Sequence, residues 1–274
     1  MPHVTAVEAE LNYLTPMTAK PVNYTFQPPP EVPWRSGKPE RHRVPIRNAR
    51  ALAQRPSLDQ QGFALVHHAT SVRELYDDAE VRSVYYPEVE AVLRQTTGAA
   101  EVVIFDHTRR SGSREQRAAT GVREPVRYVH NDYTVWSGRR RVSDQFDAAA
   151  AAERLKGRHV VINAWRPIRG PVEEMPLAVC DAQSIAPGDL VPTDLVYPDR
   201  VGEVYSLTYN PGHRWFYYPA MPPDEVLLIK TYDSLEDGRA RFTAHTAFED
   251  PTTVPGARAR ESIEVRALLF FPPS

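Results

Sequence analysis

The side chains with the clearest capacity for chemistry are His130 and Asp132, which lie two positions apart in residues 127–134. That segment carries β-branched and aromatic residues, which predicts a strand or the end of one, and residues two apart on a strand share a face. An imidazole beside a carboxylate supplies two of the three ligands of a 2-His-1-carboxylate metal centre, whose other coordination positions stay open. The competing interpretation is that His130 is a hydrogen-bonded structural residue, because His-x-Asp also occurs by chance.

Two histidines compete for the third ligand position. Arg260 and Ser262 follow His245, and on a strand they point the same way, so that a guanidinium and a hydroxyl can bind one carboxylate. A dicarboxylate cosubstrate beside the metal needs such an anchor at its far end. No Arg-x-Ser follows His213 at a comparable distance, so we favour His245. We interpret His213 and Trp215 as support for the site, substrate wall or core.

The identity of the carboxylate anchor stays open among three arginines. Arg260 is the first choice because Ser262 shares its face. Arg258 and Arg266 are the alternatives. A plainer interpretation places Arg260 and Arg266 on a solvated sheet face, paired with neighbouring glutamates.

The composition limits the kind of metal site and partner that the chain can have. Its 274 residues, 42% of them hydrophobic, are enough for one large β-rich domain. The 33 Lys and Arg against 35 Asp and Glu leave a formal net charge of −2, which gives no field to gather nucleic acid or an anionic membrane. Cys180 is the only cysteine, so an intrachain disulfide is excluded and a metal must bind through His and carboxylates.

Targeting signals are not apparent in the sequence. The segment that starts at Met1 lacks a basic start followed by an apolar run, and no stretch is long enough to span a bilayer. We therefore expect a cytoplasmic protein with no nucleic-acid or membrane partner. The oligomeric state stays open, with a homodimer as one candidate.

Residues 1–56 are expected to form an extended arm that packs on a core domain at residues 57–274. Prolines cluster at positions 28–30, 33, 39 and 45, which disfavours helix. Apolar residues such as Tyr13 and Trp34 would hold the arm against the core, as a free linker would not need them. Partial disorder of the arm is the alternative.

The core domain is predicted to be mainly β. Strand-length apolar runs bounded by Pro, Gly and Asp recur at residues 62–66, 101–105, 159–163, 176–180, 204–208, 215–218, 226–230 and 262–269. Helix signals predict only two helices, over 86–94 and over 143–156, the second with Ser143 as N-cap and Gly157 as stop. Many short strands with few helices indicate a sandwich or barrel.

These segments, in this order, resemble the gibberellin desaturase-like family, which also includes fungal and bacterial natural-product tailoring oxygenases and a protein from cephamycin methoxylation. The resemblance extends over nearly the whole chain. The similar blocks lie at residues 11–14, 85–90, 129–134, 162–168, 176–181, 203–205, 213–219, 231–234, 245–248 and 261–266. So many blocks in one order are specific for the family and less so for the substrate.

The resemblance implies a double-stranded β-helix, a jelly roll of the cupin-like type, with a few flanking helices. It implies iron(II) as cofactor and 2-oxoglutarate and O₂ as cosubstrates. The implied reaction is hydroxylation or desaturation of a small natural product in secondary metabolism, so the expected partner is a small-molecule substrate.

The resemblance also assigns residues to the site. The implied iron ligands are His130, Asp132 and His245. The candidates for binding 2-oxoglutarate are Arg260, Ser262 and Arg266. Separately from these roles, we expect Asn163, Trp165, Arg166, His213 and Trp215 to line the substrate pocket, with packing in the core as the alternative.

Two other functions are compatible with such a fold. A metal-dependent hydrolase or isomerase on a cupin-like barrel would keep the metal ligands, and a metal-free binding module would keep only the sandwich. The oxygenase is favoured because both histidines, the carboxylate and the Arg-x-Ser occur together. A degenerate binder would be expected to have lost at least one of them.

Overall fold

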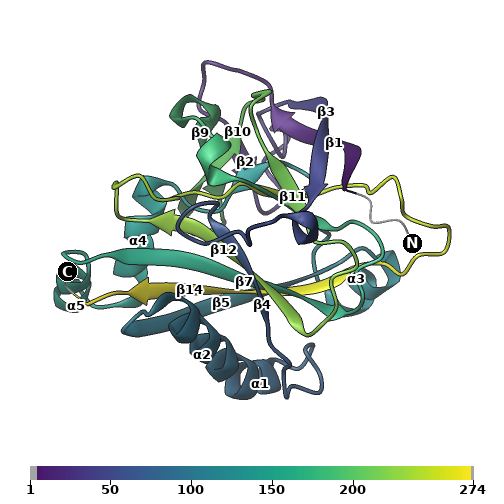
Figure 1. Cartoon of the computed structure of the whole chain (residues 1–274). Coiled ribbons are helices and arrows are strands. Elements are labelled where there is room, and N and C mark those ends of the chain that lie inside the picture. Colours follow the sequence, from purple (N-terminus) through teal and green to yellow (C-terminus); the bar gives the residue numbers. More distant parts are fainter. Residues whose placement is uncertain (1–4, 273–274) are drawn as a thin grey trace.

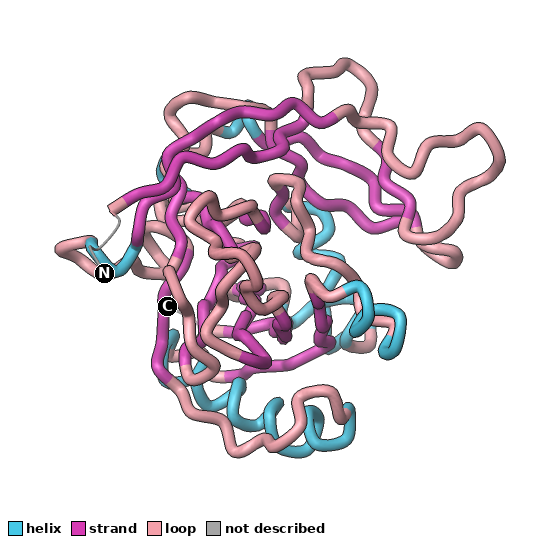
Figure 2. Tube along the Cα trace, turned by 90° about the vertical axis from the view of Figure 1, so that its right-hand side faces the viewer, coloured by secondary structure: helices cyan, strands magenta, loops and turns pink. Residues whose placement is uncertain are grey.

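Residues 5–272 are described by the computed structural model, and they form two curled β-sheets that lie against each other (Figure 1). Most of the helical segments lie below and beside the strands in the turned view of Figure 2, while loops connect the strands at the top. The fold is therefore mainly β, as the apolar runs predict.

The smaller sheet has five strands, and each of them coincides with a predicted apolar run. In spatial order they are β4 (Phe63–His67), β12 (Glu225–Asp233), β7 (His159–Arg169), β14 (Glu261–Phe270) and β5 (Glu101–Ser111). Adjacent strands pair antiparallel throughout. The outer face is covered by α2 (Tyr86–Thr97), which follows α1 (Asp78–Glu80) and a π-helical turn (Val81–Tyr85).

The larger sheet has nine strands. In spatial order they are β1 (Ala6–Leu14), β3 (Pro39–Asn48), β11 (Trp215–Tyr217), β8 (Leu177–Cys180), β13 (His245–Ala247), β6 (His130–Asn131), β10 (Val201–Leu207), β9 (Leu190–Val196) and β2 (Val22–Tyr24). The apolar runs predict β8, β10 and β11. The remaining strands are short or alternate with charged residues, so no continuous run marks them.

The expected N-terminal arm contributes strands to this larger sheet. β1 and β3 pair antiparallel, and β3 joins the rest of the sheet by parallel pairing with β11. Alternate residues of β1, from Val7 to Tyr13, are buried, as a strand with one face on a core requires. Residues 1–4 of the arm lie outside the described part of the chain, and the boundary at residue 56 stays a prediction.

One helix prediction is confirmed and the other is wrong. α2 contains the predicted 86–94 and ends before Gly98, whose φ of 72° terminates it. Instead of one helix over 143–156, the chain forms α4 (Val135–Gln145) and α5 (Ala148–Arg154). The side chain of Asp147 accepts a hydrogen bond from the Ala150 amide, so it caps α5 and separates the two helices.

The short helices complete the described chain. They are α3 (Arg114–Thr120) and three 3₁₀ turns at Ala49–Ala51, Ala182–Ser184 and Pro187–Asp189. Within residues 5–272, no helix is both long and apolar enough to cross a membrane.

The inner face of the smaller sheet carries polar side chains as well as apolar ones. Alternation along β14 places Ser262, Glu264 and Arg266 on one face, while Val265 lies on the other face in the core beneath α2. Pairing with β7 sets Asn163 opposite Arg266. A polar row therefore faces the strands of the larger sheet that bear the histidines.

Candidate metal centre

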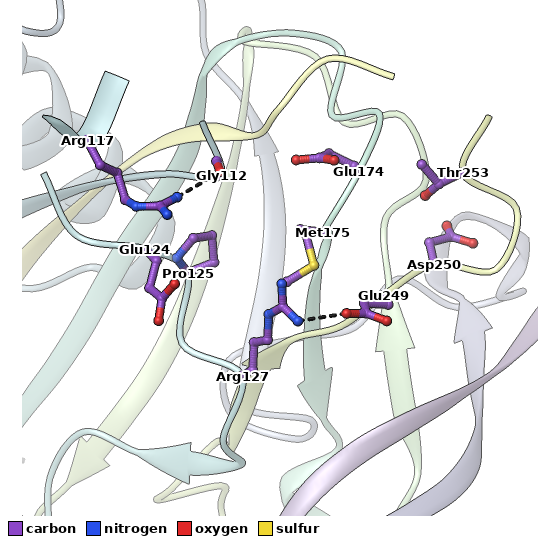
Figure 3. Close-up of a pocket in the computed structure, with 10 residues that line it drawn as sticks. All are labelled: Gly112, Arg117, Glu124, Pro125, Arg127, Glu174, Met175, Glu249, Asp250 and Thr253. Atoms are coloured by element: carbon purple, nitrogen blue, oxygen red, sulfur yellow. Dashed lines mark hydrogen bonds and ion pairs between the residues drawn. The ribbon is translucent and has the colours of Figure 1, made fainter. Parts of the chain in front are cut away.

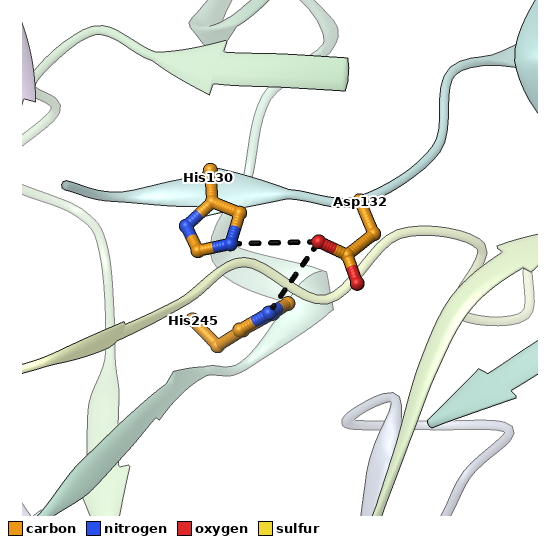
Figure 4. A group of neighbouring side chains, drawn as sticks. All are labelled: His130, Asp132 and His245. Carbon is orange, nitrogen blue, oxygen red and sulfur yellow. Dashed lines mark ion pairs between the residues drawn. The ribbon is translucent and has the colours of Figure 1, made fainter. Parts of the chain in front are cut away.

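His130, Asp132 and His245 come together where β6 and β13 pair, with His130 opposite His245 in the register (Figure 4). Their ligand atoms lie within 4.8 Å of one another. Asp132 Oδ1 is 3.5 Å from His130 Nε2 and 4.0 Å from His245 Nε2. Two imidazoles and one carboxylate facing one point fit iron(II) with open coordination positions.

The backbone fixes which imidazole nitrogen faces the metal position. Nδ1 of His130 is 2.7 Å from the Tyr128 carbonyl oxygen, and Nδ1 of His245 is 3.1 Å from the Thr243 carbonyl oxygen. A carbonyl oxygen only accepts hydrogen bonds, so Nδ1 donates and carries the proton in both rings. The Nε2 lone pairs are therefore left for a metal.

Electrostatics favour the protonation states that a metal ion needs. Burial, and then the neighbouring His130, lower the pKa of His245, so its imidazole is neutral at neutral pH. Burial alone would raise the pKa of Asp132, but nearby His130 and Arg266 hold this pKa well below its usual value. An ionised carboxylate thus lies beside a neutral imidazole.

The second oxygen of Asp132 is held by the protein. Oδ2 accepts hydrogen bonds from Asn163 Nδ2 at 2.7 Å and from Arg266 Nε at 3.3 Å. Arg266 also donates to Asp106 at 3.0 Å and to Glu264 at 2.7 Å. Its nitrogens are engaged with three carboxylates of this chain, so the assignment of Arg266 to 2-oxoglutarate is corrected to support of Asp132.

Arg260 is a buried cation without a carboxylate partner in residues 5–272. Its side chain donates from Nη1 to the Met175 carbonyl at 2.6 Å, its Nε has no partner there, and its guanidinium carbon lies 5.5 Å from the ring centre of Trp165. Burial, and then the neighbouring Arg110, lower the pKa of Arg260 to about 9. An unpaired buried charge is costly, so this position is complementary to an anion.

Of the remaining anchor candidates, Ser262 is buried like Arg260, whereas Arg258 is exposed. Ser262, two residues along, is 1% exposed on the inner face of β14. Arg258 is exposed, donates to the Gly170 carbonyl at 3.0 Å, and lies 3.9 Å from Glu173. Of the three arginines considered, Arg260 is the one that is buried and unpaired.

Comparison with known proteins identifies the family. A family model described as an oxidoreductase/YMDC permease-like domain matches residues 11–270. The hydroxylase/desaturase efuI of Hormonema carpetanum is 36% identical over 237 residues, which cover 78% of this chain and 79% of that protein. The Fe(II)/2-oxoglutarate-dependent dioxygenase nvfI of Aspergillus novofumigatus is 33% identical and covers 84% and 83%. The chain belongs to this oxidoreductase family.

The similarity to these relatives extends from the sequence to the fold, as a solved structure shows. The iron and alpha-ketoglutarate-dependent endoperoxidase NvfI superposes with a TM-score of 0.88 at 29% identity, covering 97% of this chain and 98% of that one. The likeness confirms the predicted jelly roll, and the relatives confirm the predicted class. The chain is an oxygenase that depends on iron(II), 2-oxoglutarate and O₂.

Two adjacent residues of β7 that were expected to line the substrate pocket lie on opposite faces. Trp165 pairs with Glu264 on the inner face and contacts Arg260. Arg166 lies on the outer face, where it donates to the His68 carbonyl at 3.1 Å and to the Pro223 carbonyl. The expectation for Arg166 is therefore corrected, because alternation along a strand sends neighbours to opposite faces.

His213 and Trp215 belong to a buried cluster with β1. His213 Nε2 is 3.1 Å from Asp189 Oδ2, and its Nδ1 is 3.1 Å from the Tyr13 hydroxyl. Trp215 donates to the same hydroxyl at 2.7 Å. Val179 pairs with both Phe216 and His245, whereas Trp215 pairs with Cys180, so Trp215 lies on the face of the sheet opposite His245. The expectation that His213 and Trp215 form a substrate wall is therefore corrected, and their place in the core agrees with the alternative.

Sequence reasoning missed the residues that support Arg266. Asp106 and Thr108 of β5 contact its guanidinium, together with Glu264. Residues 106–111 of this strand are all polar, so the sequence shows no alternation that would indicate which of these side chains face inward.

A cavity of about 430 Å³ lies beside two residues that contact Arg260, and Figure 3 shows the side chains that line it. It is bordered by Met175, whose carbonyl accepts from Arg260, and by Gly112, whose amide donates to the Arg260 carbonyl at 2.8 Å. Its wall is charged, and Arg127 pairs with Glu249 there at 2.7 Å. Neither the three proposed ligands nor Arg260 is among the residues that line this cavity, so we assign it no part in the site.

Proposed function

We propose that His130, Asp132 and His245 hold one iron(II) ion and that Arg260, with Ser262, binds the remote carboxylate of 2-oxoglutarate. The observation that carries this proposal is the buried, unpaired guanidinium of Arg260 in the same interior as a His–Asp–His group. A dicarboxylate could bind the metal at one end and neutralise the Arg260 guanidinium with the carboxylate at its other end. A cupin-like hydrolase would not need this second anionic position.

The chain's own side chains prepare the site for such chemistry. The backbone orients both Nε2 atoms, the carboxylate stays ionised, and Arg260 directs the cosubstrate. When bound, iron supplies the O₂-dependent oxidation in which 2-oxoglutarate becomes succinate and CO₂ while a substrate C–H bond is oxidised. Trp165 and the apolar side chains around it, such as Leu177 and Phe216, exclude water from this interior.

The substrate we propose is a small natural product that is hydroxylated or desaturated. Curated relatives carry the names hydroxylase/desaturase and aspirochlorine biosynthesis protein N, the latter from Aspergillus oryzae at 43% identity over 43% of this chain.

We propose that the reaction takes place in the cytoplasm. Cys180, the one cysteine, is a free thiol in the core, as reducing compartments favour.

Iron-dependent formation of succinate tests the proposal. Purified protein with iron(II), 2-oxoglutarate and O₂ is screened against candidate natural products, and a true substrate should increase succinate release and appear as a hydroxylated or dehydrogenated product by mass spectrometry. The His130→Ala variant should show neither. Product formation that is unaffected by omission of 2-oxoglutarate would contradict the proposed reaction.

A further inference from the structure

We infer that Asn163 and Arg266 are positioning residues that hold Asp132 with a single carboxylate oxygen directed at the metal. The inference rests on the three metal ligands proposed above. It adds which residues fix the orientation of the Asp132 carboxylate. Oδ1 faces both imidazoles, whereas Oδ2 receives the hydrogen bonds of Asn163 and Arg266.

The two donors come from neighbouring strands and are fixed in place. Asn163 on β7 lies opposite Arg266 on β14, and its side chain is fully buried. The amide orientation of Asn163 follows from chemistry, because a flipped amide would set its oxygen against the ionised oxygen of Asp132. Arg266 is held in turn by Asp106 and Glu264, so it cannot turn away without losing these contacts.

Folding stability alone does not explain an asparagine at this position. Asn163 Oδ1 is buried and has no hydrogen-bond partner among the described residues. A buried polar atom without a partner destabilises a protein, so asparagine is favourable at this position only through the hydrogen bond that its Nδ2 donates to Asp132. The Asn163 side chain donates a hydrogen bond to Asp132, so we infer that its role is to hold this ligand in position.

Binding through one oxygen has a consequence for the open positions of the site. A facial set of two histidines and one carboxylate leaves three positions on a six-coordinate metal. Chelation by a 2-keto acid uses two, which leaves one for O₂. If the Asp132 carboxylate turned to bind the metal through both oxygens, it would occupy that last position. The hydrogen bonds from Asn163 and Arg266 to Oδ2 oppose this rotation.

Asn163→Leu tests the inference, because it removes the donor while keeping the side-chain size. Metal affinity is measured without O₂ by chelator competition with iron(II) and cobalt(II). Uptake of nitric oxide, a probe for the O₂ position, is measured by electron paramagnetic resonance on the protein loaded with iron(II) and 2-oxoglutarate. Asn163→Ala is a second variant if leucine disturbs folding. Tyr85→Phe, which removes a buried hydroxyl on the other side of the sheet, is the matched control.

We expect both Asn163 variants to weaken metal binding by about 10- to 100-fold, as loss of a residue that orients a ligand does. At saturating metal they should also bind less nitric oxide, while Tyr85→Phe behaves as wild type. Unchanged nitric oxide uptake in both Asn163 variants overturns the inference, whatever their metal affinity. If His130→Ala still binds iron as wild type does, the ligand set itself fails, which is a separate result.

Discussion

His245 and His213 are both buried histidines, and they differ in what their Nε2 atoms face. His245 Nε2 is directed at Asp132 beside a second imidazole, whereas His213 Nε2 is paired with Asp189. We predict that His245→Ala abolishes iron binding. His213→Ala should keep iron but lose stability, by about 1.5–3 kcal/mol, because it removes one of the hydrogen bonds to the Asp189 carboxylate. Iron titration and urea unfolding of both variants check this, and the reverse pattern would move the third ligand to His213.

Arg260 should act on the cosubstrate and not on the metal. Truncating one partner of a buried charge pair costs about 2–5 kcal/mol, so Arg260→Ala should weaken 2-oxoglutarate binding by roughly 30-fold to a few thousand-fold. Arg260→Lys keeps the charge but not the planar fork and should fall in between. Ser262→Ala removes one neutral hydrogen bond, worth about 1 kcal/mol, and should cost several-fold.

The measurement for this arginine series is titration of the visible charge-transfer band that 2-oxoglutarate develops with bound iron(II) in the absence of O₂. Exposed Arg258 provides the control, since Arg258→Ala should leave the affinity unchanged. A large loss of 2-oxoglutarate affinity in Arg258→Ala, with no loss in Arg260→Ala, would show that Arg258 binds the remote carboxylate.

At the site, the sequence predicted which three side chains come together but not what surrounds them. Residue types, spacing and the family resemblance together pointed to His130, Asp132 and His245, whose side chains do lie together. Arg166 and Arg266 could not be placed correctly, because their surroundings depend on which face of a strand turns inward and on which strand pairs beside it. Those are properties of the sheet and not of the local sequence.

At the scale of elements, α4 packs on the sheet through Gly138. A Cβ at Gly138 would lie 2.5 Å from the Tyr232 ring, which is closer than van der Waals contact allows. We predict that Gly138→Ala destabilises the protein, since overpacking costs about 1–3 kcal/mol. This opposes the gain of about 1 kcal/mol that alanine brings to a helix interior.

Urea unfolding compares Gly138→Ala with Gly188→Ala. Gly188 has an ordinary φ and no atom within 4 Å of an added Cβ, so its variant should change stability little. A more stable Gly138→Ala protein would show that the contact of α4 with Tyr232 is looser than described.

Strands could be predicted from the sequence where a long run of consecutive residues is buried. β7 is buried over nearly its whole length, and its apolar run marks it clearly. β6 and β13 have two and three residues, too few for any periodicity, although they carry both histidines. The break before α5 was missed because an Ala-rich run suggests one helix, while the capping side chain of Asp147 starts a new one.

At the scale of the whole molecule, metal binding should stabilise the fold by mass action. At a free metal concentration 100 times Kd, the gain is about 2.7 kcal/mol. For a chain of this size that corresponds to a rise in Tm of roughly 5 °C. Differential scanning fluorimetry with cobalt(II), and then with excess chelator, should show the rise and its reversal. The His130→Ala variant should show no rise, and an equal rise there would mean that the metal binds elsewhere.

The pairing of β6 with β13 also has a consequence for the order of events during synthesis. His245 emerges from the ribosome 115 residues after His130, and Arg260 later still. A nascent chain that has produced only β6 offers one imidazole and one carboxylate, two of the three proposed ligands. The proposed centre is complete only when β13 has paired with β6, and its anion position only when β14 has joined the smaller sheet. We therefore expect tight iron binding to require the finished chain.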